Sequence, residues 1–285
     1  MNVVNVAGVR RLWRVRLCWL VPLVGALVAL HGCATMTPPP PAPMITLADA
    51  RSLLAADAAS RSHFEGVIKA ALPGLEGVVV NATLDVAVRA PAQLSVAVRS
   101  FFEVPQQILV ASDGVVTLYD ATDGTPRFSR GPASDLSLKS LVGLPLAPDD
   151  AVALLLGRAP LETTRLGWPA PRLRILDVDD QAVTVVIERA GRGAIHWRAR
   201  RSDGAFMSAT FLTGDGRAAV VAEVMERRDE GGVVFPQRLR VSLVLDHGSR
   251  GDVVLSVQDG RFNGPPLPPE AFVLEPPPGV PVSAF

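Results

Sequence analysis

The most reactive group in the sequence is the thiol of Cys33, which stands between an apolar run and a proline tract. An aliphatic residue three places before a cysteine, with a small residue directly before it, is the pattern at which bacterial lipoprotein precursors are cleaved and acylated. Leu30 and Gly32 fit this pattern, while His31 occupies a position where a small or aliphatic residue is usual. The chemistry expected here is lipidation of Cys33.

The residues before Cys33 have the parts of a secretory signal. Its basic part consists of Arg10, Arg11, Arg14 and Arg16. Residues 17–30 form an apolar core of about 14 residues, which is short for a membrane-spanning helix of roughly 20. We therefore expect residues 1–32 to be a lipoprotein signal peptide. An ordinary signal peptide or an uncleaved N-terminal anchor is the alternative interpretation.

The residues after Cys33 indicate a membrane tether. Each buried CH₂ of an acyl chain such as palmitate contributes about 0.8 kcal/mol to membrane binding, so a multiply acylated Cys33 would hold the chain on a bilayer. Position 34 is an alanine and not the aspartate that retains lipoproteins in the inner membrane under enterobacterial-type sorting. This favours an outer-membrane location facing the periplasm. Prolines dominate residues 38–43, so we interpret residues 33–45 as an extended spacer.

Charge and cysteine content exclude two classes of function. Four of the 28 basic residues precede Cys33 and none of the 28 acidic residues does, so the remainder is mildly acidic. Nucleic-acid binding needs a concentrated basic face and is not expected. The only other cysteine, Cys18, lies in the signal segment, so no disulfide or cysteine metal site is expected.

Motifs of the common enzyme classes are absent from the sequence. It has no Gly-x-Ser-x-Gly elbow, no His-Glu-x-x-His and no complete phosphate loop. The histidines after the signal segment are scattered, at His63, His196 and His247. We predict no catalytic residue, no metal and no cofactor. A triad assembled only by the fold is the alternative.

One domain, residues 46–285, is expected to follow the tether. Thr46 can cap a helix whose apolar residues Leu47, Ala50, Leu54 and Ala58 fall on one face. Residues 80–89 and 94–99 then alternate apolar and polar side chains, which is typical of antiparallel strands with one solvated face. Residues 90–93 separate them as a turn.

Asp-Gly pairs predict further turns. They occur at Asp113-Gly114, Asp123-Gly124, Asp203-Gly204, Asp215-Gly216 and Asp259-Gly260. Asp-Gly suits a tight hairpin turn because both central positions need positive φ. A calcium loop needs regularly spaced oxygens closed by a bidentate acid, which neither these pairs nor residues 177–180 provide.

The middle of the chain predicts two helices. Residues 134–142 are followed by a glycine. Residues 148–157 begin with a proline and two aspartates, are apolar all round over residues 151–156, and end at another glycine. A helix without a polar face is buried on several sides, which suits a plug against a concave sheet. Alternating patterns return after residue 171. The whole pattern predicts mainly antiparallel β-structure with helices, in a curved sheet of about ten to twelve strands.

The C-terminal part resembles the LolA/LolB lipoprotein-carrier superfamily. The resemblance rests on residues 235–241, 262–269 and 271–280, which are similar to the closing strands of that family, and on the order of the earlier elements. It covers roughly residues 48–280. It implies a half-open β-barrel whose concave apolar face, lidded by helices, holds acyl chains of a lipid or lipoprotein.

Nine residues are expected to line this face. They are Val80, Leu84, Val86, Val88, Leu94, Val96 and Val98 on the long hairpin, and Leu154 and Leu155 on the apolar helix. A fully packed core without a ligand has the same alternation, so the pattern does not distinguish the two. Under the packed alternative, the domain is a non-enzymatic scaffold that holds a protein partner in an envelope complex.

Within the resembled family, the lipid anchor favours the membrane-held receptor over the soluble carrier. Such a receptor uses an exposed apolar loop to insert its cargo. Residues 101–105 and 166–169 are the candidate apolar tips in this sequence, and either could instead belong to the core.

Overall fold

The computed structural model describes residues 45–73, 79–99, 104–134, 137–142, 144–162, 169–244 and 250–285, which belong to one compact unit. The predicted signal peptide, Cys33 and nearly all of the predicted tether lie outside these residues. So do most of the two candidate apolar tips and His247. None of the helices formed by the described residues is long and apolar enough to cross a bilayer.

The described chain forms fourteen strands and three α-helices. The helices are α2 (Leu47–Ala59), α3 (Ser137–Val142) and α4 (Pro148–Leu156), with a short 3₁₀ helix η2 (Pro269–Phe272). The first six strands are β1 (His63–Pro73), β2 (Val79–Arg89), β3 (Gln93–Arg99), β4 (Pro105–Ser112), β5 (Val115–Asp120) and β6 (Arg127–Pro132). The remaining strands are β7 (Arg172–Val178), β8 (Ala182–Glu188), β9 (Ala194–Arg200), β10 (Phe206–Leu212), β11 (Ala218–Glu230), β12 (Val233–Val244), β13 (Arg250–Phe262) and β14 (Val282–Ser283).

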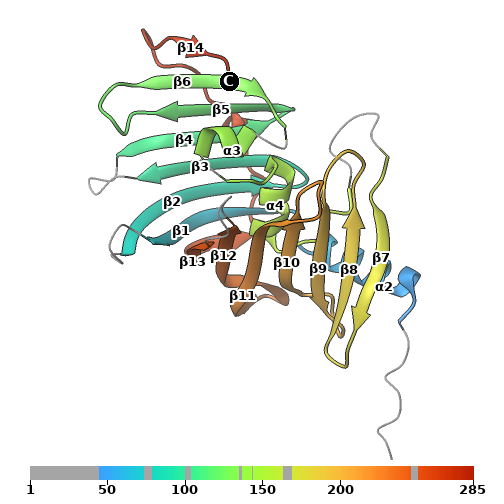
Figure 1. Cartoon of the computed structure of the whole chain (residues 1–285). Helices are drawn as coiled ribbons and strands as arrows, with labels where there is room; N and C mark the ends of the chain where they lie inside the picture. The colour runs from blue at the N-terminus through green and yellow to red at the C-terminus, as the bar shows by residue number, and fades with distance from the viewer. Residues whose placement is uncertain are drawn as a thin grey trace, which may run out of the picture. The chain divides into compact units, whose positions relative to one another are not determined.

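All fourteen strands belong to one curved, unclosed sheet (Figure 1). Their order is β14-β6-β5-β4-β3-β2-β1-β13-β12-β11-β10-β9-β8-β7, and every pair is antiparallel except β14 with β6. The predicted half-open barrel with helices is therefore confirmed. The sequence underestimated the number of strands; the two-residue β14, for example, is too short to carry an alternating apolar pattern.

Local signals placed the helices correctly. Thr46 and Asp49 form a capping box at the start of α2, with Asp49 N donating to Thr46 Oγ1 at 3.2 Å and Thr46 N donating to Asp49 Oδ2 at 3.1 Å. Ala50, Leu54 and Ala58 are buried as expected, whereas Leu47 is 42% exposed. The predicted C-terminal glycine of α4, Gly157, has a left-handed backbone conformation.

Four of the five Asp-Gly pairs lie at turns with positive φ at the glycine, and the fifth prediction was wrong. Asp259 and Gly260 lie inside β13, opposite Val67 and Gly66 of β1, next to an irregularity in the register. A Cβ on Gly260 would stand 2.4 Å from a ring atom of Phe64. Close packing against this ring requires the glycine there, as is common at a β-bulge.

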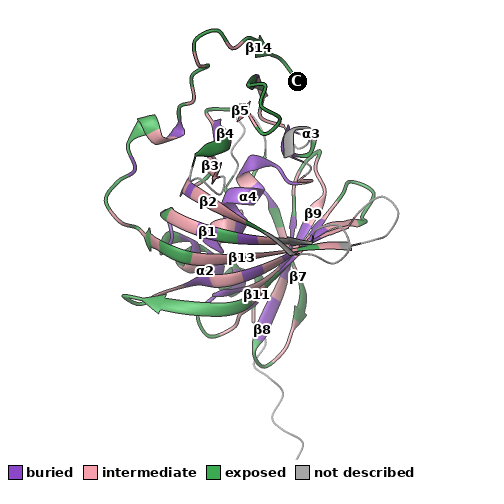
Figure 2. Ribbon diagram, turned by 90° about the vertical axis from the view of Figure 1, so that its left-hand side faces the viewer, coloured by how far each residue is buried: buried purple, intermediate pink, exposed green. Residues whose placement is uncertain are grey.

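The resemblance implied closing strands within residues 263–280, but these residues form no strand. They form η2 and an extended segment that crosses the outer face of the sheet, where Leu267 and Phe272 pack with Val110 and Ile108. Figure 2 shows this segment and α4 on opposite sides of the strands. Strands β2 to β4 are therefore covered on both faces, and their outer side is less solvated than their alternation predicted.

Gly157 offers a test of how tightly α4 is packed. Its φ is +62°, and an added Cβ would lie 2.9 Å from the ring of Pro236 in β12. Gly124 has a φ of +79° with nothing within 4 Å of its Cβ position. We expect Gly124→Ala to lower the unfolding free energy by about 1–2 kcal/mol, the cost of left-handed backbone for alanine, and Gly157→Ala to lower it by clearly more. Urea unfolding of both variants measures the difference. Equal losses would contradict the close packing of α4 on β12.

Candidate functional site

The inner face of β2 and β3 carries most of the predicted lining residues. Val86 is opposite Val96, Val88 is opposite Leu94, and Leu84 is opposite Val98 in the antiparallel register. Val86, Val88 and Leu94 are buried in one hydrophobic cluster with β4 and β5, and Leu84 and Val96 pack against it half-buried. Val98 is half-buried outside this cluster, and the side chain of Val80 lies outside the described part of the chain.

Helix α4 lies on this inner face. Its residues Ala151, Val152 and Leu156 are buried in the cluster of β2 to β5, and the predicted Leu155 packs against the same cluster half-buried. The other predicted residue of the helix, Leu154, belongs to a second cluster on β8 to β12. The helix thus contacts both halves of the sheet, which explains why its residues 151–156 have no polar face. Figure 1 shows it lying across the sheet beside α3.

The second cluster is built around Trp197 of β9. Its indole is fully buried and stacks on Phe206 with ring centroids 4.3 Å apart. Ala50 and Leu54 of α2 pack into the same cluster as Leu154 of α4, so both helices cover the same face of the sheet. The indole N–H of Trp197 has no hydrogen-bond acceptor within the described residues.

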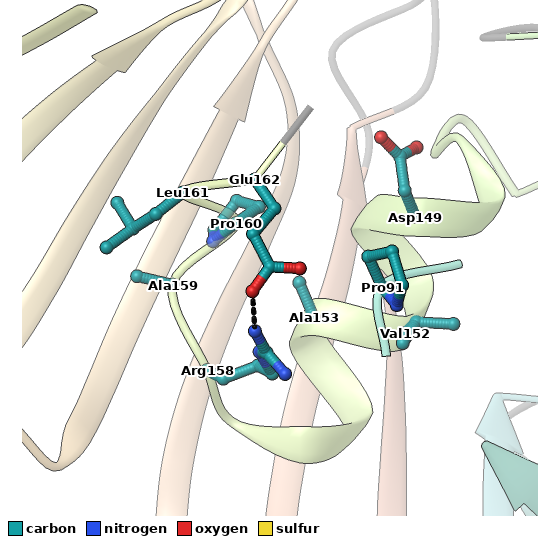
Figure 3. A pocket seen from close by; sticks show the side chains of 9 residues that line it. All are labelled: Pro91, Asp149, Val152, Ala153, Arg158, Ala159, Pro160, Leu161 and Glu162. Atoms are coloured by element: carbon teal, nitrogen blue, oxygen red, sulfur yellow. Dashed lines mark hydrogen bonds and ion pairs between the residues drawn. The ribbon is translucent and has the colours of Figure 1, made fainter. Parts of the chain in front are cut away.

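Little free volume remains in the pocket beside α4. Of the two best-formed pockets lined by described residues, the one beside α4 has about 20 Å³ of free volume, which is room for a single water molecule (Figure 3). Pro91 of the β2–β3 turn, Val152 of α4 and the ion-paired Arg158 and Glu162 help to line it. The second has about 240 Å³ and lies between polar turns at Glu188, Arg189 and residues 212–216.

Arg61 connects α2 and α4 to the sheet. This arginine is 1% exposed and donates to the carboxylate of Asp57 on α2, to the carbonyl of Val234 on β12 and, at 2.9 Å, to the carbonyl of Gly157 after α4. Burial raises the pKa of Asp57 to about 6, outweighing the opposite effect of the Arg61 guanidinium. Keeping the charged Asp57 carboxylate in this buried place therefore costs desolvation free energy.

A second group of charges holds the other end of α4. Arg192, from the β8–β9 turn, donates to Asp149 at 2.8 Å and to Asp150 at 2.9 Å, and Arg189 pairs with Asp150. Asp150 is 3% exposed, and its burial raises its pKa while the Arg189 guanidinium opposes the rise. The beginning of α4 is therefore anchored by nearly buried ion pairs, and its end by a hydrogen bond from the buried Arg61 to the Gly157 carbonyl.

Sequence reasoning missed these charged residues for different reasons. Asp57 and Arg61 are four residues apart, a spacing that favours an ion pair and could have been noticed. Arg189 and Arg192 lie about 40 residues from their aspartates, so only the fold brings them together.

The described residues form no cluster suited to a metal ion. Within the described residues, no three His, Cys, Asp or Glu side chains are placed to hold a metal ion. His63 contacts the hydroxyl of Ser62 at 2.9 Å and the carbonyl of Gly264 at 3.1 Å, at the exposed junction of β1 and β13. Asn263 accepts from Ser62 N and donates to Ser60 O, so this group joins two chain segments.

Comparison with solved structures identifies the architecture. A LolA superfamily protein from Nitrosomonas europaea superposes with a TM-score of 0.55 at 15% identity, covering 79% of this chain and 97% of the other. A domain from Vibrio parahaemolyticus named as an outer-membrane lipoprotein-sorting protein superposes with a TM-score of 0.57 at 9% identity, covering 79% and 94%. The fold is LolA-like.

A third structure, a DUF1329 family protein from Desulfovibrio piger, extends the comparison. It superposes with a TM-score of 0.53 at 11% identity, covering 79% of this chain and 96% of the other. No protein-family model matches the sequence, and no curated protein matches it. The LolA-like half-barrel was therefore recognised in the sequence by pattern and is supported by three-dimensional similarity alone.

We expect Asp57→Asn to remove a pH dependence of stability. The folded pKa of about 6 lies above the ordinary value of 3.8, so the folded state binds more protons than the unfolded state between these values. The contribution of Asp57 to the unfolding free energy is thus greatest near pH 4 and falls as the pH rises to about 6, by at most about 3 kcal/mol.

The measurement is urea unfolding of the wild type and Asp57→Asn at several pH values from about 4 to 7. The excess stability of the wild type over the variant should shrink as the pH rises. Asp123→Asn, which removes the exposed i,i+4 partner of Arg127, is the matched control. If the difference in unfolding free energy between the wild type and Asp57→Asn stays constant over this range, Asp57 is not desolvated.

Proposed function

We propose that this chain is a lipid-anchored protein of the bacterial envelope whose LolA-like half-barrel binds an acyl chain of a lipid or lipoprotein. The observation that carries the proposal is the aliphatic inner face of a LolA-like sheet, formed by Val86, Val88 and Leu94 and covered by α4. A continuous aliphatic surface suits an acyl chain because burying it is favourable without any directional contact.

In this proposal α4 occupies the place of the ligand. The free volume beside α4 is about 20 Å³, so an acyl chain enters only when α4 moves away from β2 and β3. The ion pairs at Asp150 and the Arg61 contact to Gly157 are the interactions that such a movement breaks. A ligand must therefore replace the apolar contacts of Val152 and Leu156.

The location follows from the predicted processing site. Acylated Cys33 would bind the membrane, Ala34 favours the outer one, and the proline-rich spacer would hold the half-barrel on the periplasmic side. An anchored LolA-like domain suits a receptor that takes over cargo at the membrane. We propose a binding function without catalysis, metal or cofactor, and without nucleic acid as a partner.

Cys33→Ser should release the protein from the membrane. The variant lacks the thiol that is acylated, so it should appear in the soluble periplasmic fraction, while the wild type should sediment with outer membranes. Mass spectrometry of the wild type should find an acylated Cys33 as the first residue. An unmodified Cys33 within a longer chain would contradict the anchor.

Acyl-chain binding can be measured at Trp197, which lies in the same cluster as Leu154 of α4. After removal of residues 1–32 the remaining tryptophans are Trp168 and Trp197, so Trp168→Phe leaves Trp197 as the only emitter. A stearate brominated in the middle of its chain quenches only a tryptophan that it contacts. We expect this reagent to remove most of the Trp197 emission and unbrominated stearate to leave it unchanged.

The matched control is Trp197→Phe, in which Trp168 is the only emitter. Native mass spectrometry of Cys33→Ser protein provides the stoichiometry of bound fatty acid. Unquenched Trp197 together with a fatty-acid-free mass would count against acyl binding on the inner face.

The second candidate function is a non-enzymatic scaffold for an envelope protein complex. The observation that favours it is the filled inner face, where α4 packs against both hydrophobic clusters. In that case the half-barrel is a rigid support and its surface binds the partner. Quenching and the mass measurement together distinguish the two, because a scaffold leaves Trp197 unquenched and carries no fatty acid.

A further inference from the structure

Two arginines lie beside the aliphatic inner face, at the beginning of α4. Arg189 and Arg192 come from the β8–β9 turn, and their side chains are only 11% and 7% exposed. Both donate to the carboxylate of Asp150, and Arg192 also donates to that of Asp149. Two nearly buried cations are thus held next to a hydrophobic surface by carboxylates of α4.

Helix α4 has the chemistry of an anionic amphiphile. Its first turn carries the two carboxylates, and the buried side chains that follow, Ala151, Val152 and Leu156, are apolar. The carboxylates meet the arginines, while the apolar residues cover the inner face of β2 to β5. The helix therefore fills a cationic position and an adjoining apolar surface, as an anionic head and a hydrocarbon tail would.

Movement of α4 away from the inner face would take these carboxylates away from the arginines. In the proposed function an acyl chain enters only when α4 moves, and this movement separates Arg189 and Arg192 from their aspartates. A nearly buried cation that loses its partner is costly, because the remaining charge stays desolvated. A neutral lipid replaces only the apolar contacts of α4, whereas an anionic lipid replaces the ion pairs as well.

The structure has room for a headgroup beside these arginines. Arg189 and Arg192 both line the pocket of about 240 Å³ between the β8–β9 and β10–β11 turns. The buried Nε of Arg189 has no acceptor among the described residues, so α4 does not saturate the donors of this side chain. Glu188 lines the same pocket, and its carboxylate lies 3.7 Å from Nε of Arg174. Since a water molecule takes about 30 Å³ in the liquid, a carboxylate or phosphate group fits this volume.

We propose that Arg189 and Arg192 form a headgroup site of the half-barrel, which makes its ligand an anionic amphiphile with a carboxylate or phosphate head. In the ligand-free state Asp149 and Asp150 occupy the place of the head. This inference rests on the proposed acyl-chain binding and adds a selectivity for charge. A site with buried donors rejects an analogue that leaves them unpaired, so neutral acyl esters bind poorly.

The test compares stearate brominated in the middle of its chain with its methyl ester, which has the same chain and no charge. Both are titrated at about pH 8 into Cys33→Ser protein that also carries Trp168→Phe, and quenching of Trp197 reports binding. We expect stearate to bind at least about tenfold more tightly than the ester, because only the carboxylate gives the arginines charge-assisted hydrogen bonds. Octadecyl phosphate with the same bromination shows which head is preferred, and tighter binding of either anion than of the ester supports the proposal.

Two substitutions distinguish a headgroup site from a simple latch on α4. Arg192→Gln should remove most of the preference for stearate over the ester. Asp149→Asn, which removes the more exposed of the two carboxylates, should increase this preference because the head then has less competition for Arg192. If the arginines only hold α4 in place, both substitutions loosen the helix and raise the affinities for stearate and ester by the same factor.

The matched control is Arg198→Gln, which removes a half-exposed ion pair with Asp179 in the same half of the sheet and should leave the selectivity unchanged. Equal binding of stearate and ester to the unsubstituted site, or a selectivity that survives Arg192→Gln, would overturn the headgroup site and leave acyl-chain binding intact. Failure of all three compounds to quench Trp197, with no fatty acid found by native mass spectrometry, would contradict acyl-chain binding itself and the headgroup site with it.

Discussion

Burial of α4 between the two halves of the curved sheet is the constraint on which the rest of the domain depends. Val152 and Leu156 pack on one hydrophobic cluster and Leu154 on the other, so a single helix of under three turns supports both. Without it, the inner faces of β2 to β5 and of β8 to β12 would each expose aliphatic side chains to water. The helix thus stabilises the sheet and at the same time fills the surface that an acyl chain would occupy.

Charged residues fix the position of this helix, which nondirectional apolar contacts alone do not specify. Arg61 ties the end of α4 to α2 and β12, and Arg192 ties its beginning to the β8–β9 turn. Buried ion pairs add little net stability because desolvation offsets their attraction, but removing one partner leaves an unpaired buried charge and is costly. These contacts therefore fix the position of α4 more than they raise the stability of the fold.

The outer side of the sheet is organised by the C-terminal segment. Phe272 and Leu267 cover β4, and Arg89 of β2 lies over the Phe272 ring at 4.9 Å and donates to the Leu267 carbonyl at 3.2 Å. The same segment then continues to the edge of β6. One stretch of chain thus covers an outer face and caps an edge, while the inner face is covered by helices from earlier in the sequence.

Features that depend on neighbouring residues were determined by the sequence itself. The capping box of Thr46, the left-handed Gly157 and the long hairpin of β2 and β3 follow from local backbone preferences and side-chain alternation. The resemblance, which rested on C-terminal residues and on the order of the elements, was correct in fold. Alternation shows that one face of a strand is apolar but not what covers that face. Only the tertiary structure decided that α4 fills the inner face, that residues 267–274 cover the outer one and that Arg192 meets Asp150, because these contacts join segments that are far apart in the chain.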